Sequence, residues 1–66
     1  MRVNRIKLIT LMAQKDISIL KLSELSGISR ATVTAVKSGK SCAMETASKI
    51  AKALGVDVTE IMEQGE

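Results

Sequence analysis

The sequence predicts an all-α fold, a compact five-helix bundle, on three observations. The chain of 66 residues contains no Pro and no aromatic residue, which argues against a fold built from β-strands. Its apolar residues recur at the three- and four-residue spacing of helices. Polar residues suited to begin a helix and glycines suited to end one separate these apolar segments.

The length of the chain predicts that residues 1–66 form a single domain, near the lower size limit for independent folding. The single Cys excludes an internal disulfide. No apolar run approaches the roughly 18 residues that a membrane span needs. No signal peptide is visible after Met1, so we expect a cytoplasmic protein.

The first two helices are predicted from their caps. One begins after Asn4 and runs to about Gln14, with an apolar side formed by Val3, Leu8, Leu11 and Met12 and with Ile6 as a further candidate. Another begins after Ser18 and ends near Ser26, where Gly27 interrupts it. Its predicted core pair is Leu22 and Leu25.

The stretch SGISRATVTAVKSGK, residues 26–40, admits two interpretations. Its β-branched centre is typical of a short strand. Ser29, however, suits a helix N-cap, and Gly39 suits the left-handed position just after a helix. A strand here would have no partner, because no other segment has a strand pattern. We therefore predict a third helix over residues 29–37, with Val33 and Val36 facing inward.

Two more helices are predicted in the second half of the chain. One ends at Gly55 and places its apolar residues at helical spacing: Met44, Ala47, Ile50, Ala51 and Leu54. A short last helix follows from about residue 57 or 59 to Glu63, with Ile61 facing inward.

Residues 18–37 have the spacing of a helix-turn-helix, two short helices joined by a turn that contains glycine. The helices cross closely, and Ser23 provides the small side chain that the crossing needs. Gly27 provides a residue that tolerates positive φ in the turn. Leu22, Ile28 and the two inward valines would hold both helices on the core.

Charge is unevenly distributed along the sequence. Residues 1–40 carry eight Lys or Arg against two acidic residues, a balance of +6, and residues 41–66 have a balance of −3. The basic part favours a polyanionic partner, although an ordinary solvated surface is the alternative.

Two segments carry a resemblance to a known family: LSELSGISRATVTAVKSGKS, residues 22–41, and METASKIAKALGVDVTEIM, residues 44–62. Both are similar to the Cro/C1 family, the small five-helix DNA-binding domains of phage repressors and their bacterial relatives. The resemblance implies a sequence-specific regulator of transcription, of the phage or mobile-element repressor type, that reads an operator half-site with helix 29–37.

By position, the resemblance implies the residues that contact DNA. In the recognition helix and the loop after it they are Ser29, Arg30, Ala31, Thr32, Thr34, Ala35, Ser38, Lys40 and Ser41. The chemistry agrees, because Arg can bond bidentately to guanine and the methyl groups of Ala and Thr can contact the thymine methyl. Lys and Ser in a loop suit phosphate oxygens.

The chain also departs from the family pattern. Ile19 stands where relatives carry a Gln that binds phosphate, and Met12 and Lys37 stand where many relatives carry a buried Arg–Glu pair. Ile19 and Leu20 would contact DNA sugars, cover a partner or pack on the first helix. Ala43 or Cys42 stands where a Ser cap is common in relatives, so we expect the fourth helix to begin less firmly.

The expected partner is a double-stranded DNA operator that forms an inverted repeat. One recognition helix reads too few base pairs to select an operator, so a homodimer on DNA is expected. Its contacts are predicted at the chain end, at Val58, Ile61 and Met62.

No enzymatic activity is expected, because the chain has no His, no nucleophile–base pair and no glycine-rich phosphate loop. We likewise expect no cofactor, no metal site, no membrane contact and no small-molecule ligand. Two alternative functions stay open: the antitoxin of a toxin–antitoxin pair, and a protein-interaction module that kept the fold without DNA binding.

Overall fold

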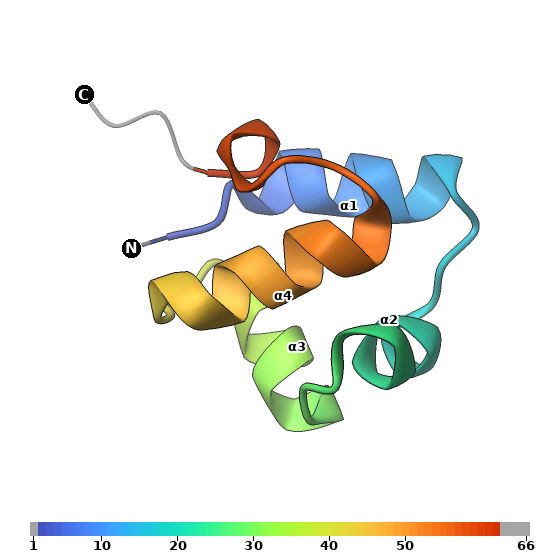
Figure 1. The fold of residues 1–66 in the computed structure, drawn as a ribbon, viewed down its shortest axis with the longest axis horizontal. Helices are drawn as coiled ribbons and strands as arrows, with labels where there is room; N and C mark the ends of the chain where they lie inside the picture. The colour runs from blue at the N-terminus through green and yellow to red at the C-terminus, as the bar shows by residue number, and fades with distance from the viewer. Residues whose placement is uncertain (1, 63–66) are drawn as a thin grey trace.

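A computed structural model describes residues 2–62. In this part of the chain, the elements are α1 (Arg5–Gln14), α2 (Ile19–Ser26), α3 (Arg30–Lys37), α4 (Met44–Leu54) and the 3-10 turn η1 (Val58–Glu60) (Figure 1). In the view of Figure 1, α4 crosses the middle of the picture, with α1 and η1 above it and α2 and α3 below it. Helix α3 packs against both α1 and α2, and α4 packs against α2 and η1. The predicted all-helical fold is confirmed. None of the helices described here has the length and apolar character required to cross a membrane.

Side-chain caps begin the first three helices where the sequence predicts them. Asn4, Ser18 and Ser29 each accept hydrogen bonds from backbone N–H groups two or three residues later, at 3.0 to 3.3 Å. These bonds satisfy N–H groups that have no partner inside the helix. Helix α4 begins after Ala43 without a side-chain cap, as predicted.

The core is built from aliphatic side chains of all the helices and of the chain ends. No polar or charged residue among those described is buried. With no aromatic side chains available, the hydrophobic stabilisation comes from many small contributions of about 25 cal/mol per Å² of buried apolar surface. The buried residues are Val3, Leu8, Met12, Leu22, Val33, Val36, Ala47, Ile50, Ala51, Leu54 and Ile61.

The predicted core pair of α2 is wrong. Leu22 is fully buried, but Leu25 is 50% exposed. The inner side of α2 is formed by Leu22 with the half-buried Ile19, Ser23 and Ser26. These positions are three or four residues apart, and Leu25 lies outside the stripe that they define.

Two other apolar residues, Met44 and the further candidate Ile6, were expected on inner sides of their helices and lie at the surface. Ile6 is 66% exposed and Met44 is 53% exposed. Ile6 stands two residues before the buried Leu8, which places it about 200° around the helix from that side chain. Met44 is the first residue of α4 and stands at its exposed end.

The predicted fifth α-helix is not confirmed. Where it was expected, the described residues form the single turn η1, and the predicted end at Glu63 lies outside them. Asp57 caps this turn by accepting hydrogen bonds from the hydroxyl and the N–H of Thr59. These two bonds hold the pKa of the Asp57 carboxyl below its usual value, and the bond from the Thr59 hydroxyl contributes most.

The chain start explains why the helix does not continue. The N–H of Asn4 donates to the carbonyl of Ile61 at 2.7 Å, and Val3 pairs with Met62 in an isolated antiparallel bridge. The backbone at residues 61–62 is therefore bonded to the first residues of the chain. A long-range pairing of this kind leaves no local pattern in the sequence.

Leu22 and Leu25 provide a matched test of the core, since they are identical residues on one helix. Leu22→Ala should lower the free energy of unfolding by about 2–5 kcal/mol, because it leaves a cavity in the core. Leu25→Ala should lower it by about 1 kcal/mol at most, because half of that side chain already lies in water. Urea unfolding followed by far-UV circular dichroism measures both, and equal losses would contradict the placement of α2.

Candidate nucleic-acid interface

The turn between α2 and α3 is fixed at two residues singled out from the sequence, Gly27 in the turn and Ser23 at the helix crossing. Gly27 adopts φ +73°, a left-handed conformation that a residue with a Cβ reaches only at a cost. The Ser23 hydroxyl donates to the carbonyl of Ile28 on the other side of the turn. Since Ser23 belongs to α2 and Ile28 leads into α3, this bond fixes the crossing of the two helices.

Helix α3 is divided lengthwise between core and solvent. Val33 and Val36 are buried, as predicted, and they attach one side of the helix to the core. The residues predicted to contact DNA lie on the other sides: Arg30, Ala31, Thr32 and Thr34 are exposed and Ala35 is half-buried. The exposed Ser29 caps the helix by accepting the Thr32 N–H.

The loop after α3 presents a second set of predicted contact residues. Ser38, Lys40 and Ser41 are all exposed. The Ser38 hydroxyl, however, donates to the carbonyl of Ala35 at 2.8 Å, so its proton is engaged within the chain. Lys40 and Ser41 are therefore better placed than Ser38 to donate to a phosphate.

Two arginines near the start of the chain lie beside this loop. Arg2 pairs with Ser41 in an isolated antiparallel bridge. Arg5 packs beside Gly39, where an added Cβ would lie 3.6 Å from Arg5 Cδ. Three exposed basic residues, Arg2, Arg5 and Lys40, thus belong to adjoining segments at one end of α3. The sequence alone left the placement of Arg2 and Arg5 open, because only the folded chain brings them beside the loop.

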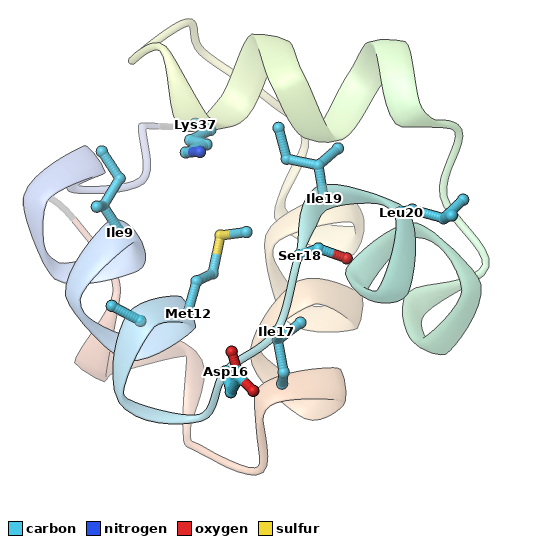
Figure 2. A pocket seen from close by; sticks show the side chains of 9 residues that line it. Ile9, Met12, Asp16, Ile17, Ser18, Ile19, Leu20 and Lys37 are labelled. Atoms are coloured by element: carbon cyan, nitrogen blue, oxygen red, sulfur yellow. The ribbon is translucent and has the colours of Figure 1, made fainter.

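A surface depression of about 630 Å³ lies between α1, α2 and the end of α3. Figure 2 shows that Ile9 and Met12 of α1, Ile19 of α2 and Lys37 of α3 line it. Met12 and Lys37 therefore lie on opposite sides of one shallow space. The lining is largely apolar, with Asp16 as its acidic residue.

The positions of Ile19 and Leu20 at the start of α2 differ with respect to this depression. Ile19 is half-buried and packs against the core, so it belongs to the contact of α2 with the rest of the domain. Leu20 is 52% exposed and points away from Ile19 (Figure 2). Of the two residues, Leu20 alone keeps most of its surface available.

The residues predicted to form a dimer differ in exposure. Val58 and Met62 are half-buried, whereas Ile61 is fully buried in the core. Ile61 therefore offers no surface to a partner in this conformation. The exposed Ile6 lies near this region, because it borders a depression of about 250 Å³ together with Glu60 of η1. From the sequence, Ile6 was only a further candidate for the core, and its place at this surface was not predicted.

Solved structures share this fold. Two of them align with 100% of the chain at a TM-score of 0.84 and 18% sequence identity: PhpD with cadmium complexed with hydroethylphosphonate, and native PhpD with cadmium atoms. The chain covers 14% of the length of each PhpD chain. At this identity the similarity concerns the fold alone. No curated protein matches the chain.

A family model matches far more specifically. Residues 7–64 match the Cro/C1-type HTH DNA-binding domain, and this range includes the helix-turn-helix, the following loop and α4. The resemblance seen in the sequence is confirmed. The chain belongs to the Cro/C1-type helix-turn-helix DNA-binding domain family.

Proposed function

We propose that this protein is a sequence-specific transcriptional regulator, a repressor of the phage or mobile-element type, and not an enzyme. The observation that carries the proposal is the division of α3. Its valine side is buried in the core, and its opposite sides expose Arg30 and small polar or apolar side chains. An α-helix presented in this way fits the major groove, where base edges can be distinguished.

The neighbouring charges support the same function. Lys40 and Ser41 lie just beyond α3, and Arg2 and Arg5 adjoin that loop. Contacts from such groups to phosphates fix the position of a protein on the duplex without reading its sequence. Arg30, at the start of α3, is the one charged residue among the exposed residues of that helix, and it would read a guanine.

The alternative functions have less support. An antitoxin or a protein-interaction module would need an apolar surface for its partner, and α2 was the candidate. Ile19 packs against the core, so Leu20 remains as the exposed apolar residue at the start of that helix. The basic residues beside α3 would also have no role in such a module.

We further propose that two copies bind an inverted repeat. Two recognition helices about 34 Å apart enter successive major grooves of B-DNA. Among the described residues near the chain end, Val58 and Met62 keep part of their surface available, and the exposed Ile6 lies nearby. Because so small an area gives a weak interface, the dimer would form mainly on DNA.

Lys40 and Arg30 should have different effects on DNA binding. With about three to five phosphate contacts per subunit, log K against log salt should have a slope of about −0.9 per contact. Lys40→Ala should weaken binding to all DNA sequences alike and flatten the slope by about 0.9 per subunit.

Arg30→Ala should cost about 1–3 kcal/mol of binding free energy per half-site on the best sequence and relax the preference at one base pair.

Fluorescence anisotropy with a labelled duplex and its single base-pair variants measures both effects. Lys52→Ala is the control for lost charge, because Lys52 on α4 lies beside η1 and the end of α2. It should change the slope little. A wild-type slope near zero would refute DNA binding, and an unchanged base preference in Arg30→Ala would refute guanine readout.

The dimer proposal can be tested at Met62. Met62→Asp should reduce cooperative binding to a full inverted repeat, because it places a charge in an apolar contact. Binding to an isolated half-site should hardly change. Leu25→Asp adds the same charge at an exposed apolar residue elsewhere and should leave both affinities unaltered. Equal losses on the full site and the half-site in Met62→Asp would place the dimer contact elsewhere.

A further inference from the structure

We infer that α3 recognises its half-site chiefly through the C5-methyl groups of thymines, beside one guanine read by Arg30. The inference rests on the proposed DNA-binding function. In the major groove, Asn or Gln pairs with adenine, Asp or Glu with cytosine, Arg or Lys with guanine, and methyl groups contact thymine. The side chains that α3 exposes therefore limit the bases that it can distinguish.

Helix α3 lacks the amide and carboxylate side chains that usually pair with adenine and cytosine. Its sequence, RATVTAVK, contains no Asn, Gln, Asp or Glu. Val33 and Val36 are buried, so their methyl groups are not available to DNA. Lys37 is half-buried and borders the depression between α1 and α2, apart from the exposed residues Arg30, Ala31 and Thr34. Adenine and cytosine thus lack their usual partners on this helix.

The remaining side chains form a strip of methyl groups. Ala31, Thr34 and Ala35 are spaced three and four residues apart, which places them on one face of the helix. Ala31 and Thr34 are exposed, and Ala35 is half-buried. Thr32 is also exposed, and its hydroxyl accepts a hydrogen bond from Ser29 at the helix start. The strip ends at Arg30, the charged donor.

Small side chains also permit the close approach that methyl readout needs. The major groove is about 12 Å wide, and a helix with its side chains measures about 10–12 Å across. A helix that carries alanines on the leading face can therefore lie deep in the groove. There the thymine methyl protrudes toward it, and contact removes apolar surface of both partners from water.

Uracil tests this inference, because it pairs as thymine does but lacks the C5-methyl group. Sites are first selected from random duplex DNA with the wild-type protein. The enriched duplex is then synthesised with uracil in place of each thymine in turn, and its affinity is measured by anisotropy. We expect a loss of about fourfold, or about 0.8 kcal/mol, for each thymine methyl in contact.

Two threonine variants connect the loss to this helix. Thr34→Ser removes one methyl group and keeps the hydroxyl, so it should abolish the uracil penalty at one thymine and preserve the others. Thr10→Ser is the matched control, because Thr10 is an exposed threonine on α1 outside the predicted DNA contact, and it should preserve every penalty. Thermal unfolding of both variants, followed by circular dichroism, verifies that each remains folded at the temperature of the binding assay.

The outcomes separate the inference from the proposed function. Equal affinity for thymine and uracil duplexes, with sequence preference retained, would overturn methyl readout and leave the DNA-binding regulator intact. A uracil penalty that Thr34→Ser and Thr10→Ser leave equally unchanged would overturn the assignment to Thr34. If no site were enriched from random DNA, the proposed function itself would fail, and the inference with it.

Discussion

The burial of Val33 and Val36 is the constraint on which the rest of the structure depends. Both side chains are almost completely excluded from solvent, and they fix the rotation of α3 about its own axis. A rotation by one residue position would bring a threonine hydroxyl toward an aliphatic core at a cost of about 1–3 kcal/mol without a new hydrogen bond. The identity of the exposed strip follows from these two valines.

The same packing is needed for α3 to be helical at all. The helix has eight residues, and an isolated helix of that length is marginal in water. Its valines and threonines lower the intrinsic propensity further, by a few tenths of a kcal/mol each. The Ser29 cap and the packing against α1 and α2 compensate for this. The exposed side of α3 thus exists only when the whole domain is folded.

Local signals predicted the fold well, and long-range contacts explain the errors. Asn4, Ser18 and Ser29 cap helices where the sequence predicts them, since a cap depends on residues within one turn. Leu25 was assigned wrongly, because an eight-residue helix offers too few positions to define its inner stripe. The last helix was predicted too long, because its end is set by Asn4 at the other end of the chain.

In the candidate site, too, local signals predicted some features and long-range contacts determined others. The exposed strip of α3 was predicted from spacing and from the family resemblance, whereas the position of Arg5 beside Gly39 required the folded chain. Its function does not follow from the fold alone, because a domain of the same shape forms part of the PhpD chains. DNA binding is supported instead by the family match and by the side chains that α3 and the next loop present.

The central claim is that α3 and the loop after it meet the DNA. Amide chemical shifts of the ¹⁵N-labelled protein, recorded during titration with a duplex selected from random DNA, test this claim most directly. We expect the largest changes over residues 29–41 and at Arg2 and Arg5, with small changes in the second half of α4. Changes confined to the depression lined by Ile9, Ile17 and Leu20, or to α4 and η1, would contradict it.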